Sequence, residues 1–366
     1  MGPLKSLSVV EFAGLGPAPL AGQLLADMGA DVVVIDRKPA PVDVTDVNAR
    51  GKRSIVLDLK SPAGLAAAHK VIARSDVLIE GFRPGVMERL GLGPADCPNT
   101  LIYARMTGWG QDGPWAHMAG HDINYLALTG ALNAMGAKDA PPIPPMNLVA
   151  DYGGGTMFLL FGILSALFER GVSGRGQVVD AAMVDGVPAM MGLIHGFLAN
   201  GRWNEDRFSN LFDGAAPFYR CYTCADGRFI SVGALEPQFY ALLLDGLGLP
   251  SSYAETQNDR STWAARSAEF ADVFKTRSRD EWAAHFDGSD ACVAPVMSFT
   301  EAAEHPHMAA RRALQSPEGV LQSAPAPRFS RSVPADLQPI GAKGADTAEV
   351  LRDAGLTEAE IAELMP

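Results

Sequence analysis

The stretch LSVVEFAGLGPAPLAGQLLADMGADVVVIDR, residues 7–37, decides the fold. Residues 7–12 are an apolar run of strand length, a loop rich in glycine and proline follows, and residues 18–28 have the composition of a helix. Residues 31–35 form a second apolar run of strand length. A strand, a helix and a second strand joined by short turns predict a βαβ unit with parallel strands.

This first unit imitates the fingerprint of dinucleotide-binding folds. Gly14 and Gly16 follow the first strand, and the acidic Asp36 comes about twenty residues later, as in that fingerprint. The imitation fails at the third glycine position, which is Pro19, and Pro17 stiffens the loop that would enclose a pyrophosphate. We therefore predict a nucleotide-type fold without an NAD site.

The alternation of strands and helices continues to about residue 110. Strand patterns at residues 54–58, 77–80 and 101–106 alternate with helix patterns at residues 62–74 and 87–90. Such alternation with short turns predicts the α/β class, with a doubly wound and mainly parallel sheet.

A second, smaller domain is expected, because 366 residues are too many for one ordinary core. Strand patterns at residues 219–223 and 229–233 precede helical segments that extend to about residue 310. They predict an α+β domain. Residues 316–345 are rich in proline and irregular, and helix patterns at 347–354 and 357–365 close the chain.

The net charge of −12 argues against a nucleic-acid partner, but the charge is unevenly spread. Residues 1–110 contain 12 Lys and Arg against 11 Asp and Glu, whereas the remaining residues contain 18 against 31. A locally basic region in an acidic protein is compatible with a polyanionic small molecule. Ordinary surface charge is the alternative.

Cysteine usage predicts a reduced, cytoplasmic protein, because the four cysteines show no framework spacing. Cys221 and Cys224 have the spacing of a redox or metal site, but no second Cys or His pair lies nearby. We interpret them as two half-buried strand residues. No signal-peptide pattern opens the chain, so we expect no membrane segment there.

Residues 120–156 contain the side chains that we expect to carry the chemistry. His121 lies in a Gly-His-Asp segment, and Asp151 precedes a glycine triplet. A long apolar helix pattern follows Thr156 and is expected to end near Phe168, too short to span a bilayer. The glycines would then lie at the N-terminus of that helix, where free N–H groups favour negative charge.

His121 and Asp151 could form an acid/base pair beside such a helix end. The alternatives are a structural hydrogen bond between the two side chains and an ordinary turn at the glycines.

Basic residues follow several predicted strands, at the edge where open α/β sheets bind ligands. Arg37, Lys60, Arg83 and Arg105 each fall at or just past a predicted strand end, so one sheet edge could gather them into an anion site. Glu236 stands immediately before a helix that starts with proline, where capping is the alternative to a functional role.

Taken in chain order, these segments resemble the family III CoA-transferases, and within them the racemase branch. The resemblance covers nearly the whole chain and weakens only between about residues 250 and 345. Each block is weak alone, and their order makes them specific: residues 31–37, 52–60, 81–86, 101–110, 120–125, 147–155, 174–180 and 226–236.

The resemblance implies a CoA thioester substrate and assigns roles to individual residues. The catalytic set is His121, Asp151 and Glu236, with Glu236 orienting His121. Arg37, Arg83 and Arg89 are expected at the CoA phosphates, and Arg105 is a weaker candidate. The remaining substrate-binding candidates bracket the adenine end or flank the thioester: Leu57, Leu59, Lys60, Gly81, Gly120, Asp122 and Tyr125.

The family also implies an architecture: an interlocked homodimer with a Rossmann-like large domain and a small domain. We expect the large domain at residues 1–195, a connector at 196–220 and the small domain at 221–310. Residues 311–366 would then form a second connector and helices that return to the large domain. No metal or further cofactor is implied, because CoA is part of the substrate.

Residue type within the family favours racemisation of a 2-methylacyl-CoA. His121 and Asp151 would lie on opposite faces of the substrate, one removing the α-proton and the other returning a proton to the planar enolate. Backbone N–H groups near Asp122 or at the glycine run could hold the enolate oxygen. The alternatives are a CoA-transferase with Asp151 as nucleophile and a non-catalytic acyl-CoA-binding protein.

Overall fold

The computed structural model describes residues 2–365, and the chain divides into two compact units. Unit 1 comprises Met1–Thr129, Pro145–Met190 and His307–Pro366, and unit 2 comprises Gly130–Pro144 and Met191–Pro306. The stretch Gly130–Pro144, which the sequence analysis assigned to the first domain, belongs to unit 2 because Arg207 donates hydrogen bonds to three of its carbonyl groups.

Unit 1 is built on a six-stranded sheet in which every strand is parallel to its neighbours. The order is β3-β2-β1-β4-β5-β6, so the chain starts at the centre, moves to one edge and then crosses to the other side. The predicted α/β fold with a doubly wound parallel sheet is therefore confirmed. The strands are β1 (Ser8–Phe12), β2 (Asp31–Asp36), β3 (Arg53–Val56), β4 (Val77–Glu80), β5 (Ile102–Thr107) and β6 (Val178–Ala182).

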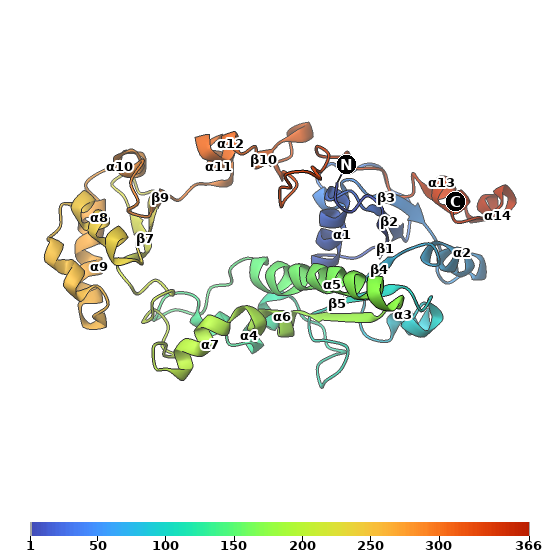
Figure 1. Ribbon diagram of the computed structural model, residues 1–366, viewed down its shortest axis with the longest axis horizontal. Helices are drawn as coiled ribbons and strands as arrows, with labels where there is room; N and C mark the ends of the chain where they lie inside the picture. Colours follow the sequence, from blue (N-terminus) through green and yellow to red (C-terminus); the bar gives the residue numbers. More distant parts are fainter. Residues whose placement is uncertain (1, 366) are drawn as a thin grey trace. The chain divides into compact units, whose positions relative to one another are not determined.

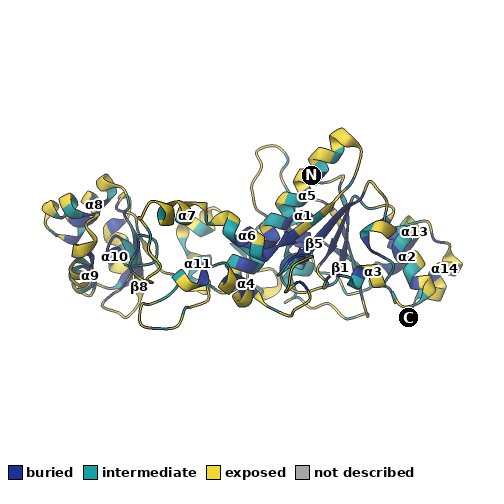
Figure 2. Cartoon of the chain, turned by 90° about the horizontal axis from the view of Figure 1, so that it is seen from below, coloured by how far each residue is buried: buried dark blue, intermediate teal, exposed yellow. Residues whose placement is uncertain are grey.

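Burial of both sheet faces explains why the central strands are apolar nearly throughout. Val9 and Val10 of β1 and Val77 and Leu78 of β4 are buried, as the dark central strands in Figure 2 show. Parallel strands covered on both faces have this continuous apolar pattern. The exception in β1 is Glu11, which forms a buried ion pair with Lys52 at 2.7 Å.

Helices cover both faces of the sheet (Figure 1). α1 connects β1 to β2, toward the β3 edge of the sheet, whereas α2 connects β3 to β4, toward the β6 edge. Because both crossovers are right-handed and run in opposite directions, they place their helices on opposite faces. The α-helices of unit 1 are α1 (Pro17–Asp27), α2 (Pro62–Ile72), α3 (Val86–Arg89), α4 (Asp122–Leu128), α5 (Met157–Ser173), α6 (Met183–Met190), α12 (Pro306–Ala310, whose first residue belongs to unit 2), α13 (Thr347–Asp353) and α14 (Glu358–Leu364).

The C-terminal segment is an integral part of unit 1. Val350 and Leu351 of α13 and Ile361 of α14 join the apolar core around α2. Just before α13, Ser54 of β3 donates its backbone N–H to the Asp346 carboxylate at 2.8 Å. An antiparallel bridge pairs Ala40 with Lys343. The end of the chain thereby reaches the rim of the sheet beside β2 and β3.

The helix that contains Asp151 is longer than predicted. A π-helix over Leu148–Thr156 runs directly into α5, so the glycine triplet lies inside a helix and not at its N-terminus. The predicted end near Phe168 is also wrong. The helix continues through Arg170, which pairs with Asp76 at 2.8 Å, and Gly174 ends it in the left-handed conformation with φ 71°.

Leu148–Ser173 is, among the described residues, the one helix long and apolar enough to cross a membrane, although soluble core helices pass the same test. Figure 2 shows that α5 carries many exposed residues. It nevertheless packs against β5 and β6, and Asp151 near its start lines a cavity. The expectation of no membrane segment stays a prediction.

Unit 2 has a three-stranded antiparallel sheet of order β7-β8-β9, packed against helices. Its predicted strands at 219–223 and 229–233 are confirmed. The elements are α7 (Gly192–Ala199), β7 (Tyr219–Thr223), β8 (Phe229–Gly233), α8 (Pro237–Leu247), α9 (Arg260–Phe274), α10 (Arg279–Phe286), β9 (Val293–Pro295) and α11 (Phe299–Glu304).

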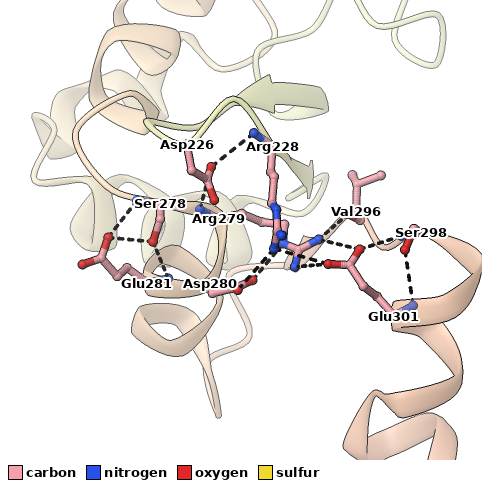
Figure 3. Close-up of polar contacts among 9 residues, drawn as sticks. All are labelled: Asp226, Arg228, Ser278, Arg279, Asp280, Glu281, Val296, Ser298 and Glu301. Carbon is pink, nitrogen blue, oxygen red and sulfur yellow. Dashed lines mark hydrogen bonds and ion pairs between the residues drawn. The ribbon is translucent and has the colours of Figure 1, made fainter.

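One buried arginine connects several segments of this unit through ion pairs and hydrogen bonds (Figure 3). Arg279 at the start of α10 pairs with Glu301 of α11 and with Asp280, both at 2.8 Å, and donates to the Val296 carbonyl at 3.1 Å. The hydrogen bonds from Arg279 and from Ser298 lower the pKa of Glu301 to about 2. Arg279 therefore joins α10, the segment after β9 and α11, and serves the fold.

Candidate active site

A cavity of about 820 Å³ opens at the carboxyl ends of β1, β2, β4 and β5. Its wall includes the loops that follow these strands, at residues 13–18, 36–38, 81–84 and 106–109. The strand order reverses its direction of growth at β1 and β4, which is where doubly wound sheets bind ligands. The other lining residues are Ala40, Ala116, Met118, Ala119, Gly120, His121, Tyr125, Asp151, Met183 and Lys343.

His121 reaches the cavity from the residue just before α4. Its backbone N–H donates to Oδ1 of Asn124 at 3.1 Å, and its own carbonyl accepts from the N–H groups of Asn124 and Tyr125. The main chain at His121 is thus fixed by the first turn of the helix. The residue itself is exposed and lines the cavity, so its imidazole is available to a bound molecule.

Asp151 lines the same cavity from the first turn of the π-helix. Its Oδ2 lies near the loop before α1, since a side-chain carbon added at Gly16 would be 3.7 Å from that oxygen. Burial raises the pKa of Asp151, and so does the charge of Asp122, whereas a hydrogen bond from Asn147 and the charge of His121 lower it. The net shift is upward, which suits a carboxyl group that must take up and release a proton.

Small residues allow α6 to pack closely against the π-helix. The backbone of α6 crosses the π-helix so closely that a side-chain carbon at Gly154 would lie 2.7 Å from Val187. The reciprocal carbon at Gly186 would lie 1.9 Å from the Gly154 carbonyl oxygen. Only glycines permit this contact. The π-helical winding, which often occurs at functional sites, sets the direction of Asp151.

An aromatic cluster holds the segment before His121. The ring of Tyr125 meets Trp109 edge to face at 4.7 Å, and Trp109 meets Trp115 at 4.9 Å. The Tyr125 hydroxyl donates to the Gly120 carbonyl. The indole N–H of Trp109 is buried without a partner among the described residues, and Trp109 lines the cavity. Sequence analysis noted this segment but assigned Trp109 no role.

Another part of the cavity wall is basic. Arg37 and Lys38 follow β2, Arg83 follows β4, and all three are exposed lining residues. Lys343 joins them from the C-terminal segment, and its ammonium group lies 3.7 Å from Asp36 and 3.8 Å from Asp46. Sequence analysis missed Lys343 because it lies in an irregular stretch far along the chain, where no local spacing marks it.

The structure brings many of the predicted binding residues together at this cavity. Gly81 and Gly120 line it, as do Arg37, Arg83 and Tyr125. Four others are not among its lining residues: Leu57, which is buried in the core, Leu59, Lys60 and Arg89. They follow β3 or β4 at the same edge of the sheet, and their contact with an adenine or phosphate group stays a prediction.

Arg105 needs a correction, because its guanidinium group is already occupied. It pairs with Glu80 and with Glu88, both at 2.9 Å, and it is 7% exposed. Burial raises the pKa of Glu80, and the bond to Arg105 opposes that shift. Arg105 is not a lining residue of the cavity. We therefore assign it to the packing of β4 against β5 and not to a phosphate site.

Two further predicted residues are also not among the lining residues of the cavity. The side chain of Asp122 is buried and is not among the cavity lining, although the backbone of Asp122 directly follows His121. Glu236 belongs to unit 2, where it precedes α8 without capping it through its side chain. Its pairing with His121 of unit 1 stays a prediction.

The strand interpretation of the cysteines holds only in part. All four are free; Cys221 lies within β7 and is exposed, whereas Cys224 directly follows β7 and is buried. Burial raises the pKa of both thiols, which disfavours the reactive thiolate. Within residues 2–365, no group of three or more His, Cys, Asp or Glu side chains is placed to hold a metal ion.

The chain is similar to known proteins over nearly its whole length. The family model described as CoA-transferase family III matches residues 4–340. The chain is 46% identical to an alpha-methylacyl-CoA racemase of Mus musculus, over 99% of this chain and 96% of the relative. It is 44% identical, with the same coverage, to an alpha-methylacyl-CoA racemase of Homo sapiens. A crystal structure of a CAIB/BAIF family protein from Brucella suis superposes with a TM-score of 0.79 at 26% identity, covering 96% of this chain and 99% of that one.

Proposed function

This chain belongs to CoA-transferase family III, and from that membership we propose that it is an α-methylacyl-CoA racemase. It interconverts the (2R) and (2S) forms of 2-methylacyl-CoA thioesters by 1,1-proton transfer. The observation that carries the proposal is the meeting of His121 and Asp151 at one cavity with a basic wall. Relatives that are 44–46% identical over nearly the whole chain are named for this activity.

The reaction needs two proton-transfer groups and a place for negative charge. One of His121 and Asp151 takes the proton from C2, and the electron pair of that C–H bond moves into an enolate whose charge rests on the thioester oxygen. The conjugate acid of the other group then returns a proton to the opposite face of C2. The two groups exchange roles when the substrate has the opposite configuration.

Backbone N–H groups at the start of α4 are the best placed to hold the enolate oxygen. The first N–H groups of a helix lack acceptors within the helix, and those of Asp122 and Ile123 follow His121 directly. The glycine run is less suitable than the sequence suggested, because the π-helix uses its N–H groups. One well-placed donor of this kind contributes about 2.7–4 kcal/mol to catalysis.

The basic wall suits the phosphates of CoA. Arg37, Lys38, Arg83 and Lys343 present cationic groups at one cavity, and arginine in particular forms paired hydrogen bonds with phosphate oxygens. The thioester would then extend toward Gly120 and Tyr125. The cavity volume of about 820 Å³ lies in the range of pockets that enclose small molecules.

The first test is proton NMR of a 2-methylacyl-CoA incubated with the protein in heavy water. Loss of the C2 proton signal together with racemisation, in the absence of any acceptor acid, is the expected result. Transfer of CoA to an added carboxylate without exchange at C2 would instead establish a transferase with Asp151 as nucleophile. Binding without either reaction would leave a non-catalytic acyl-CoA-binding protein.

We further propose that the protein acts as a homodimer of the interlocked kind. Supporting this, α5 exposes an apolar stripe at helical spacing, with Phe161 71%, Phe168 81% and Val172 85% exposed. Because the opposite side of α5 packs on the sheet, a second copy of the chain is a better cover for this stripe than lipid. Light scattering after gel filtration measures the mass directly.

The remaining expectations are also part of the proposal. Glu236 would orient His121 and stabilise its charged form in the assembled enzyme. We place the protein in the cytoplasm, in keeping with its free cysteines. It would need no cofactor beyond the CoA of its substrate, and branched fatty acyl chains are one candidate class of acyl group.

A further inference from the structure

We propose that Asp122 is the positioning residue for Asp151: its buried carboxylate fixes the start of the π-helix and sets a negative charge beside the catalytic carboxyl group. The inference rests on the proposed racemase function and deepens it, because it assigns a residue that controls one of the two proton-transfer groups.

The geometry starts from two hydrogen bonds. Oδ2 of Asp122 accepts from the backbone N–H of Asp151 at 2.8 Å and from that of Ala150 at 3.0 Å. Both N–H groups belong to the first turn of Leu148–Thr156, where no acceptor exists within the helix. A carboxylate at a helix N-terminus is stabilised by these groups and by the helix dipole. Asp122 therefore ties α4 to the backbone of Asp151.

The same residue also fixes the other proton-transfer group. Asp122 is the first residue of α4 and directly follows His121 in the chain. A single side chain thus joins the backbone at His121 to the backbone at Asp151, 30 residues apart in sequence. The spacing between two groups that act on opposite faces of one carbon depends on such a link.

The charge of Asp122 needs a separate explanation. Asp122 is 7% exposed, and its Oδ1 is buried with no hydrogen-bond partner among the described residues. Burial of an oxygen that lacks a partner is unfavourable, and more so for a charged group. An asparagine would accept the same two hydrogen bonds without the charge. The negative charge itself is therefore the feature that serves Asp151.

The surroundings of Asp151 show what that charge does. Burial is the largest cause that raises the pKa of Asp151, and the charge of Asp122 is the second, whereas Asn147 and His121 lower it. The other charged groups on the packed elements interact elsewhere: the charge of Asp185 acts on Asp180, Arg105 pairs with two glutamates, and Arg170 pairs with Asp76. Removal of the Asp122 charge thus leaves Asp151 more acidic.

The test compares Asp122→Asn, Asp122→Ala and wild type in pH profiles of kcat/KM for racemisation. Asp122→Asn keeps the acceptor for both N–H groups and should retain activity at the optimum within about tenfold. Its acid limb should move to lower pH, because Asp151 then loses its proton at lower pH. Asp122→Ala also releases the π-helix, and we expect a loss of about 10²-fold, as for an ångström-scale misplacement.

Asp76→Asn is the matched control. Asp76 also accepts a backbone N–H, from Ser8 at 3.0 Å, but at the amino-terminal edge of the sheet, opposite the cavity. The acid limb of the kcat/KM pH profile of Asp76→Asn should superimpose on that of wild type. A wild-type acid limb in Asp122→Asn, or full activity in Asp122→Ala, would overturn the proposal.

A second readout separates this inference from the proposed function. Carbon NMR of 13C-labelled aspartate, with the Asp151 signal assigned through Asp151→Asn, follows the titration of that carboxyl group without turnover. The Asp151 midpoint should be lower in Asp122→Asn than in wild type. An unchanged midpoint rejects the role of Asp122 even if the protein racemises, and a lowered midpoint supports it even if the reaction proves to be a transfer.

Discussion

The two parts of the cavity wall are built from opposite kinds of side chain. At the basic wall, Arg37, Arg83 and Lys343 are long, exposed and held loosely, with the Lys343 ammonium 3.7 Å from the nearest carboxylate. At the other part, His121 and Asp151 are short and attached to backbone that is fixed by hydrogen bonds and packed glycines. Both parts are polar, and only one is rigid.

This difference separates binding from chemistry. Flexible cations can follow a phosphate group through small motions, and each contributes a modest, screened interaction. Proton transfer to and from one carbon requires groups held at a fixed distance and angle. We therefore expect substitutions at the rigid part to lower kcat and substitutions at the basic wall to raise KM.

The largest effects should come from His121→Gln and Asp151→Asn, which keep the size of each side chain. Without one of the two proton-transfer groups, racemisation should fall by about 10²–10⁴-fold, while KM for the thioester stays within about threefold of wild type. Chiral separation of the product thioesters measures the rate. His69→Gln on α2, outside the cavity, is the control and should be fully active.

The same two variants should reveal which face each group serves. Each retains one base, so each should exchange the C2 proton of only one enantiomer with heavy water and should not invert it. The two variants should prefer opposite enantiomers. If either variant exchanges both enantiomers at the wild-type rate, the substituted residue is not a proton-transfer group.

Arg105→Met tests whether a basic residue near the same sheet edge can be excluded from substrate binding. Arg105 lies within β5 and pairs with a buried glutamate. The substitution leaves Glu80, which is 1% exposed, without its ion-pair partner. Loss of one partner of a buried pair costs roughly 3–5 kcal/mol of folding stability. Because burial already raises the pKa of Glu80, the loss should be smaller at low pH, where the carboxyl group is protonated, and should grow as pH rises.

Urea unfolding of Arg105→Met at about pH 5 and about pH 8 measures this dependence. KM should equal the wild-type value wherever the variant is folded. A stable variant with a raised KM would return Arg105 to the substrate-binding residues.

Local pattern was enough to predict the sheet, and also the residues that follow directly from strand ends. Arg37 and Arg83 come just after β2 and β4, so a parallel sheet necessarily brings them to one edge. His121 and Asp151 were predicted from their polar, glycine-rich settings and do line the same cavity. Family membership was predicted from the order of such segments and is confirmed.

What the sequence did not predict depends on partners distant in the chain. The sequence placed Arg105 at a strand end like Arg83, but Arg105 lies within β5, where Glu80 of the neighbouring strand occupies its guanidinium group. The close crossing of the π-helix and α6 requires glycine at both Gly154 and Gly186, which are 32 residues apart in the chain. Lys343 reaches the cavity through a bridge to Ala40 that no spacing within either segment indicates.

Arg83→Met is expected to act on binding alone. A charge-assisted hydrogen bond contributes about 1.5–3 kcal/mol, so KM for a 2-methylacyl-CoA should rise about 10–100-fold with kcat nearly unchanged. A pantetheine thioester, which carries the acyl group but no phosphate diester or adenine, is the informative second substrate. Wild type and Arg83→Met should have the same KM for it. A kcat loss with both substrates would mean that Arg83 acts on the chemistry through Tyr125, whose pKa is raised by burial and by Asp151 while Arg83 opposes that rise.

The smallest effect should come from Lys343→Met, because the Lys343 side chain is 43% exposed and its two ion pairs are long. Exposed charges of this kind contribute about 0–1 kcal/mol, so KM should rise no more than about fivefold. The effect should disappear in high salt, since screening weakens exposed charges first.

Lys70→Met on α2 is the matched control: its side chain is 40% exposed and pairs with Glu360, but it lies outside the cavity. If both lysine variants behave alike, the basic wall ends at Arg37, Lys38 and Arg83, and the C-terminal segment supports the sheet without contacting substrate. If only Lys343→Met raises KM, the end of the chain is part of the binding site.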